Sequence, residues 1–158
     1  MQTKTVAFGG EGGKAFSDPE RDGTYQLSKI NIQAEDYIHV MQIVLKRGNI
    51  EITNPRRGQT GGYAYTYVPS GPITKVKLNY DPNYVVNYIE FHESNGQVKS
   101  YGKNKTDSKY KITTININGE IVGIYGRAGN LMDKLGFLVN RPKVFEQVKT
   151  ETEWKATK

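Results

Sequence analysis

Three segments of this 158-residue chain repeat one pattern of apolar residues, and the repeat limits the fold more than any other feature. The segments start at Glu35, Asn83 and Gly129, which lie 48 and then 46 residues apart. In each segment the third, fourth, seventh and ninth positions are apolar or aromatic. A repeat at a fixed period is the sequence signature of a body built from equivalent structural units. We therefore expect three copies of one unit.

Each unit is predicted to be a loop, a strand, a tight turn and a returning strand. The turns are expected at residues 47–49, 94–96 and 141–143, where Gly, Asn or Pro can reverse the chain. Short alternating runs recur throughout, whereas no long stretch keeps helical spacing. Three such sheets packed by their inner faces predict an all-β prism or barrel-like body. The predicted strands are residues 3–8, 27–33, 37–45, 49–53, 74–80, 84–92, 97–101, 110–117, 120–125, 135–139 and 144–150.

The loop of the third unit has the composition of a polar binding site. Gly126 and Gly129 permit turns that expose backbone N–H groups, and Asp133 adds a carboxylate four residues after Gly129. Fixed donors beside one acidic acceptor suit a ligand that is covered with hydroxyl groups. In the first unit Glu35 and His39 take the places of Gly129 and Asp133, and the second unit has two asparagines there. The full arrangement therefore occurs once.

A second glycine-rich stretch, residues 9–13, does not fit the nucleotide-binding motifs. A Walker A loop needs Gly where Phe8 stands, and Ser or Thr where Ala15 stands. A dinucleotide fingerprint must open a helix, and the residues up to Pro19 do not propagate one. No phosphate site is expected, and a turn between strands is the alternative interpretation.

Three motifs, in this order along the chain, resemble the jacalin-related lectins. They are Gly9-Gly-Glu-Gly-Gly-Lys-Ala-Phe-Ser-Asp18, Tyr101-Gly102 and Ile121-Val-Gly-Ile-Tyr-Gly-Arg-Ala-Gly-Asn-Leu-Met-Asp133-Lys-Leu-Gly136. The resemblance covers residues 5–139 and implies a β-prism of three Greek-key sheets with pseudo-threefold symmetry, in agreement with the repeat. It also implies a lectin domain over residues 1–145 and a C-terminal extension over residues 146–158.

The resemblance further implies where a sugar would bind. In that family one monosaccharide sits between the glycine loop and the loop that carries the aspartate, without a metal ion. Carried over to this chain, Gly13, Asn130 and Leu131 would offer backbone N–H groups, Gly129 would shape the loop, and Asp133 would accept from two adjacent hydroxyls. Chains that stay uncut near the glycine loop resemble the mannose and glucose binders. Mannose or glucose is therefore the expected ligand.

Some relatives have a second sugar site, built from the first unit's loop and a further glycine pair. This chain keeps Gly61 and Gly62, but Glu35 lacks the backbone freedom of glycine and His39 cannot accept two hydroxyls as a carboxylate does. One site per chain is expected, and a weak second site remains the alternative.

Two tyrosines, Tyr63 and Tyr84, are candidates to stack on a second sugar ring, with packing on a sheet as the alternative. The region around residues 80–101 is also shorter than in many members of the family. The second sheet is therefore expected to be trimmed.

The charge of the chain leaves a second function open. A formal net charge of +6 favours attraction to anionic polymers such as sulfated glycans, although acids are interleaved with the bases as on an ordinary solvated surface. No nucleic-acid motif is present, so a nucleic-acid partner is not expected. Hydrolysis of sugars would need a second acid facing Asp133, and none has a fixed spacing to it. Two His and no Cys predict no metal site and no cofactor.

The expected partners are mannose- or glucose-containing glycans and further copies of the chain. Shallow sugar sites bind weakly, and a homo-oligomer would strengthen the binding through several sites. The sequence has no signal peptide at its start and no apolar run that could span a membrane. We expect a soluble protein, either cytoplasmic or secreted by a non-classical route.

Overall fold

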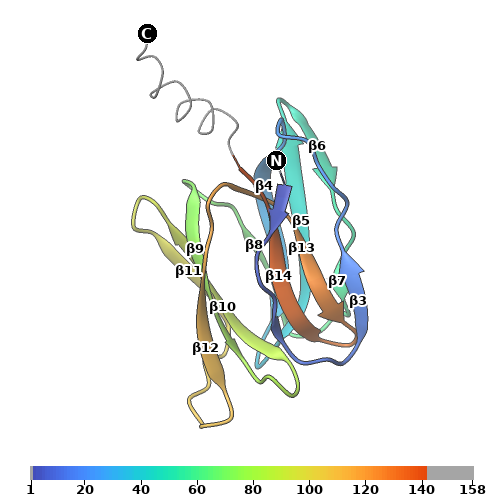
Figure 1. Cartoon of the computed structure of the whole chain (residues 1–158), viewed down its shortest axis with the longest axis vertical. Coiled ribbons are helices and arrows are strands. Elements are labelled where there is room, and N and C mark those ends of the chain that lie inside the picture. Colours follow the sequence, from blue (N-terminus) through green and yellow to red (C-terminus); the bar gives the residue numbers. More distant parts are fainter. Residues whose placement is uncertain (1, 142–158) are drawn as a thin grey trace, which may run out of the picture.

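Residues 2–141 are described by the computed structural model, and within this range the regular structure consists of strands alone. The strands form three antiparallel sheets (Figure 1). This confirms the predicted all-β fold. The strands are β1 (Gln2–Lys4), β2 (Phe8–Gly9), β3 (Lys14–Ser17), β4 (Gln26–Ala34), β5 (Ile38–Arg47), β6 (Ile50–Thr53), β7 (Arg57–Gly58), β8 (Tyr63–Tyr67), β9 (Ile73–Tyr80), β10 (Val86–Glu93), β11 (Val98–Gly102), β12 (Lys111–Asn116), β13 (Glu120–Ala128) and β14 (Met132–Asn140).

The three sheets share one strand order, as the sequence repeat predicts. The orders are β6-β5-β4-β8, β11-β10-β9-β12 and β1-β14-β13-β3, with short β7 and β2 added beside β5 and β14. The three repeat segments thus provide β5, β10 and β14, one inner strand of each sheet. The second sheet lacks a separate short strand because β11 runs on without a break to Gly102. It is therefore the trimmed sheet.

Each sheet has a glycine at the equivalent position, so the threefold symmetry extends to single residues. Each of these glycines faces the carbonyl oxygen of the fifth residue of its repeat segment. A Cβ built on the glycine would lie about as close to that oxygen in all three sheets: 2.0 Å for Gly9 and Asp133, 1.9 Å for Gly58 and His39, and 2.1 Å for Gly102 and Asn87. Any side chain at this position would clash with the neighbouring strand, so only glycine fits there.

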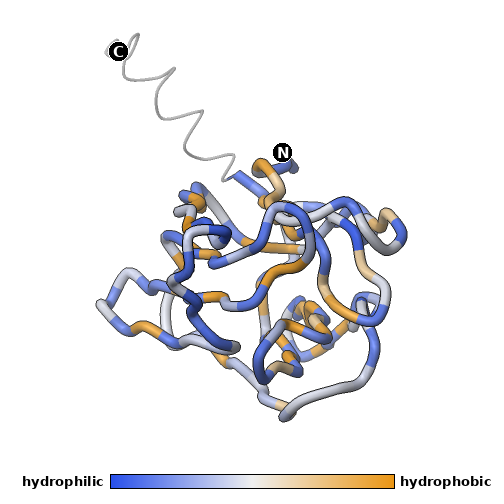
Figure 2. The backbone as a smooth tube through the Cα atoms, turned by 90° about the horizontal axis from the view of Figure 1, so that it is seen from below, coloured by the Kyte–Doolittle hydropathy of each residue, from blue (hydrophilic) through white to orange (hydrophobic). Residues whose placement is uncertain are grey.

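The repeated apolar positions form the core. The fourth, seventh and ninth positions of all three segments are fully buried. Alternation turns the seventh and ninth positions to one face of the strand, and a register shift at the fifth position of each segment brings the fourth to the same face. Figure 2 shows the resulting interleaving of hydrophobic and hydrophilic stretches along the chain. Burying one such side chain contributes about 2 kcal/mol. The nine residues are Ile38, Met41, Ile43, Val86, Ile89, Phe91, Met132, Leu135 and Phe137.

The third unit departs from the predicted hairpin. A returning strand was expected at residues 144–150, which lie outside the described residues. The place beside β14 is taken by β1, with Gln2 opposite Asn140 and Lys4 opposite Leu138. On the other side, β14 pairs with β13. The N-terminal strand therefore closes the third sheet.

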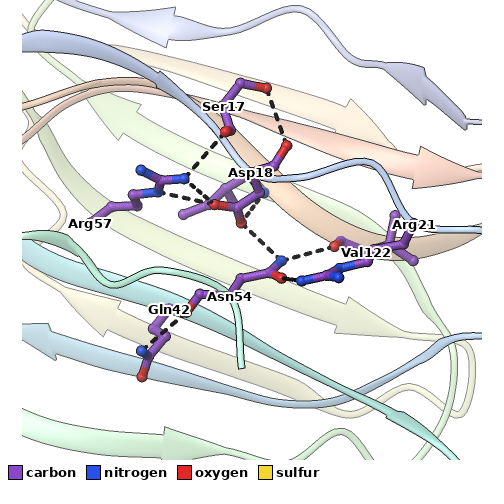
Figure 3. A network of polar contacts seen from close by, with 8 residues as sticks. Ser17, Asp18, Arg21, Gln42, Asn54, Arg57 and Val122 are labelled. Carbon is purple, nitrogen blue, oxygen red and sulfur yellow. Dashed lines mark hydrogen bonds and ion pairs between the residues drawn. The ribbon is translucent and has the colours of Figure 1, made fainter. Parts of the chain in front are cut away.

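A buried polar network fastens the first sheet to the third (Figure 3). Asp18, which follows β3 and is 4% exposed, accepts hydrogen bonds from Arg57 Nε at 3.0 Å and from the backbone N–H of Ile124 at 3.0 Å. Asn54 donates to Asp18 Oδ2 and to the carbonyl of Val122, both at 3.2 Å. The network therefore holds the end of β3, the strand that follows residues 9–13.

Candidate functional site

The loops that open the three repeat segments lie at one end of the prism, the lower end in Figure 1. The glycine loop, defined here as residues 9–13, passes along the same end. The two ends of the described chain, Gln2 and Arg141, lie at the other end of β14. Any site built from these loops therefore faces away from the chain ends.

The glycine loop packs directly on the residue that was predicted to hold the sugar. The N–H of Gly10 donates to the carbonyl oxygen of Asp133 at 2.7 Å. A Cβ on Gly12 would lie 2.7 Å from Asp133 Oδ2, and one on Gly13 would lie 2.7 Å from Oδ1 and 2.5 Å from the carbonyl carbon of Ala128. Gly13 also has a φ of +67°, which favours glycine. The Asp133 carboxylate thus stands open only because both neighbours lack side chains.

The turn before β14 places backbone N–H groups beside this carboxylate. Gly129 N–H donates to the carbonyl oxygen of Leu131 at 3.0 Å, which closes the turn. Among residues 2–141, no acceptor is hydrogen-bonded to the N–H groups of Gly13, Asn130 and Leu131. The predicted residues Gly13, Gly129, Asn130, Leu131 and Asp133 therefore come together in one place, which we call the cup.

Two charged contacts that sequence reasoning missed hold the cup in shape. Arg127 donates from Nε to the carbonyl of Gly12 and from Nη2 to that of Gly13, both at 3.0 Å. Lys134 and Glu11 form an ion pair at 2.6 Å across the two loops. The sequence indicates these contacts only through the charged residues in the two loops that form the cup. No motif fixes the spacing between these charged residues.

The charge state of Asp133 is set by its position in the cup. Partial burial raises the pKa of the carboxyl above its usual value, against the lowering effect of backbone N–H groups and of the Arg127 charge. The pKa of Glu11 is lowered by its hydrogen bond and charge interaction with Lys134. The cup therefore offers one carboxylate acceptor and three amide donors, and hydroxyl groups can pair with both.

The loop before β5 repeats the geometry of the cup but not its chemistry. Glu35 N–H donates to the carbonyl oxygen of Tyr37 at 3.1 Å, as Gly129 does to Leu131. Gly62 has a φ of +71°, and a Cβ on Gly61 would lie 2.4 Å from His39 Nδ1. This second cup thus has an imidazole where the first has a carboxylate.

The loop before β10 forms no cup. Asn87, in the place of Asp133, is fully buried and donates to Asn79 Oδ1. Lys105 stands where the other cups have glycine, and its backbone is held by Asn79 through its N–H at 2.8 Å and its carbonyl at 3.1 Å. Of the two asparagines of the second unit, Asn87 is therefore part of the packing, whereas Asn83 is exposed.

The two candidate tyrosines lie in different places. Tyr84 is 48% exposed and adjoins the cup, since a Cβ on Gly10 would lie 2.7 Å from its backbone nitrogen. Tyr63 is 62% exposed and pairs with Ala34, beside the second cup. Only Tyr84 is placed next to the predicted sugar site.

Metal sites, membrane-spanning helices and larger hollows were compared with the cup over the described residues. Residues 2–141 include no group of three or more His, Asp or Glu side chains placed to hold a metal ion. In the same range no helix has the length and apolar character needed to cross a membrane. A hollow of about 700 Å³, lined by Tyr25, Ile73 and Ile117, lies at the opposite end of the prism from the cup. The cup is a shallow site of exposed amides by comparison.

Comparison with known proteins identifies the fold and the family. The jacalin-like lectin domain matches residues 5–138. Jacalin-related lectin 32 of Arabidopsis thaliana is 27% identical over 146 residues, which cover 86% of this chain and 47% of that protein. The chain thus spans about half the length of this curated relative.

Solved structures of lectins share the fold at low identity. The mannose-binding lectin from champedak has a TM-score of 0.73 and 21% identity, covering 88% of this chain and 96% of the other. The artocarpin–mannotriose complex has a TM-score of 0.73 and 20% identity, covering 88% and 97%. The threefold repeat, the three sheets and the match over residues 5–138 agree: the chain belongs to the jacalin-like lectin domain family.

Proposed function

We propose that this domain is a lectin that binds one mannose- or glucose-type sugar in the cup. Asp133 accepts hydrogen bonds from two neighbouring hydroxyls of the sugar, and the N–H groups of Gly13, Asn130 and Leu131 donate to its oxygens. The observation that carries the proposal is the close approach of Gly12 and Gly13 to the Asp133 carboxylate. The family is non-enzymatic, and we propose no catalytic role.

The chemistry of the cup favours a neutral polyol over other ligands. Each sugar hydroxyl can donate one hydrogen bond and accept others, so adjacent hydroxyls satisfy a carboxylate and an amide together. Hydrogen bonds to a charged acceptor are short and directional. A hydroxyl of the wrong configuration leaves one of these groups without its partner, at about 1 to 3 kcal/mol. Selectivity for mannose and glucose follows from that difference.

The names of the structural neighbours agree with this ligand. The champedak protein is described as mannose-binding, and artocarpin was solved with mannotriose. Because the identities are low, these names support the ligand class and not a particular linkage. A single shallow cup is expected to bind with a dissociation constant of about 1 mM, or about 4 kcal/mol. We propose that several copies act together to raise the affinity.

A glycan array with matched variants tests the proposal. Wild-type protein should bind mannosides or glucosides, and Asp133→Ala should lose this binding. His39→Ala changes the equivalent residue of the second cup and should bind as wild type does. Equal binding by wild type and Asp133→Ala would show that the sugar lies elsewhere, and the absence of any glycan ligand would refute a lectin function.

A further inference from the structure

The segment between β11 and β12 carries positive charge at the same end of the prism as the cup. Residues 103–110 include Lys103, Lys105 and Lys109, with Asp107 as the one acid. Within the described chain none of the three lysines forms an ion pair with an acidic side chain. Their charge is thus available to a ligand.

Lys105 is held in place by its surroundings. Its Nζ lies 4.0 Å from the centroid of the Tyr37 ring and 5.5 Å from that of Tyr110. Its backbone is fixed by two hydrogen bonds to Asn79, which is 1% exposed. Aromatic rings attract a cation without neutralising its charge. An anion that meets Lys105 therefore finds an ordered ammonium group, and little further ordering is required.

A chain of direct contacts leads from the cup to Lys105. Gly10 donates to the carbonyl oxygen of Asp133 and packs against the backbone of Tyr84. The Tyr84 ring meets the Tyr37 ring edge-on, with centroids 5.7 Å apart, and Lys105 lies over Tyr37. Tyr84 is 48% exposed and so offers a surface to a sugar ring. A glycan that leaves the cup in this direction passes Tyr84 before it meets Lys105.

We propose that Tyr84 and Lys105 form a subsite for an anionic sugar residue linked to the sugar in the cup. The second ring stacks on Tyr84, and its sulfate or carboxylate group pairs with Lys105. The subsite rests on the proposed function, because the cup supplies the anchor. It assigns an acidic or sulfated mannose-type glycan as the ligand class.

The acids of the neighbouring loops do not cancel this preference. Glu35 and Asp36, both exposed, lie on the loop that carries Tyr37, and neither is ion-paired with Lys105. Glu11 is already paired with Lys134. Recognition of the sulfate or carboxylate group is therefore assigned to Lys105 and not to the net charge of the protein.

Calorimetric titration with three matched disaccharides tests the subsite. The ligands are a mannose disaccharide, the same disaccharide with a sulfate on its second ring, and one whose second ring is a uronic acid. Wild type should bind one or both anionic ligands about fivefold more tightly than the neutral one at low salt. The advantage should shrink as the ionic strength rises to about 1 M, where the screening length is about 3 Å.

Three variants locate the effect. Lys105→Gln should bring the anionic ligands to the affinity of the neutral one, and Lys105→Arg should keep the preference. Lys46→Gln removes one charge from an exposed lysine at the far end of β5 and should keep it as well. The proposal is overturned if Lys105→Gln retains the preference, or if Lys46→Gln loses as much of it, since a long-range field would then explain the binding.

Two further measurements separate this inference from the proposed function. Tyr84→Ala should weaken the disaccharides but not a methyl mannoside, because the single sugar ends in the cup. Asp133→Asn should abolish binding of all ligands, and an unchanged affinity for the sulfated ligand would refute a subsite linked to the cup. If wild type binds no neutral mannoside at all, the proposed function itself fails. If it binds neutral and anionic ligands equally, only the subsite fails.

Discussion

Gly12 lies against the carboxylate of Asp133, so that a Cβ on Gly12 would stand 2.7 Å from Asp133 Oδ2. The glycine comes from the loop before β3 and the aspartate from β14, more than a hundred residues later. This contact makes the openness of the Asp133 carboxylate depend on the absence of a side chain at Gly12.

Gly12→Ala is therefore expected to weaken mannoside binding by at least tenfold with little effect on folding. The φ of Gly12 lies outside the left-handed region, so alanine is compatible with the backbone, and the movable end of Asp133 has to give way. Calorimetry with methyl mannoside and thermal unfolding would measure the two effects. Gly61→Ala places the same methyl group against His39 in the second cup and should leave mannoside binding unchanged. Strong binding by Gly12→Ala would contradict the assigned position of the sugar.

Mannoside affinity should fall on acidification at a higher pH than an ordinary aspartate would cause. Binding needs the ionised carboxylate, and burial raises the pKa of Asp133 above its usual value of about 3.9. Titrations between about pH 7 and pH 4 would follow the loss. A flat profile through this range would show that Asp133 does not accept hydrogen bonds from the sugar.

The same shift predicts that Asp133 does not stabilise the fold at neutral pH. A carboxyl whose pKa is raised on folding stabilises the protein below its unfolded pKa, and this contribution is lost as the pH rises through its folded pKa. At pH 7 the unfolding free energy of Asp133→Asn should therefore be at most about 0.5 kcal/mol below that of wild type, or it should exceed it. The variant should bind no sugar. Urea unfolding monitored by circular dichroism tests this, and a large destabilisation would assign Asp133 a structural role.

Asp18→Ala should destabilise the protein by about 3 kcal/mol, because the partly buried Arg57 would lose its only ion-pair partner in the described residues. The side chain of Asp18 is fully buried and also accepts from the backbone of Ile124. Arg47→Gln breaks an exposed pair with Asp22 at 3.8 Å and should change the stability by less than about 1 kcal/mol. Equal effects of the two variants in urea unfolding would contradict the structural role of the network.

Glu93 should account for part of the loss of stability in acid. Burial raises its pKa, but hydrogen bonds from Ser70 and Tyr67 outweigh burial and leave the pKa lowered. A lowered folded pKa gives stability that is present above the unfolded pKa and is lost as the pH falls through the folded value. Glu93→Gln should therefore flatten the pH dependence of the unfolding free energy below about pH 5. The exposed Glu20→Gln is the control, and identical slopes for the two would exclude this role.

The repeat in the sequence was sufficient to predict the three sheets, because the same apolar positions that define it are the fully buried ones. Three strands were not predicted. Strand β8 (Tyr63–Tyr67) has four exposed residues out of five, and β3 and β7 are short strands beside glycine turns, so none has a clear apolar alternation. The returning strand predicted for the third unit at residues 144–150 lies outside the described residues. No local pattern could reveal that β1, from the opposite end of the chain, lies beside β14.

The predicted sugar-binding residues could be brought together from sequence only through the family resemblance. Gly13 and Asp133 are 120 positions apart, and no periodicity connects them. The stabilising contacts of Arg127 depend on carbonyl directions in the glycine loop, which follow from backbone geometry. Sequence therefore indicates which residues form the cup, and the fold explains why the cup is open.

The pairing of Gln2 with Asn140 has a practical consequence for presenting the domain. The two strand ends meet side by side, about 26 Å along β14 from the cup, given its nine residues. A tether attached at either end would orient every immobilised copy with its cup toward the solution. A short peptide joining residues 2 and 141 would likewise allow the chain to be reopened at the turn of residues 94–96, giving a circular permutant whose cup is untouched.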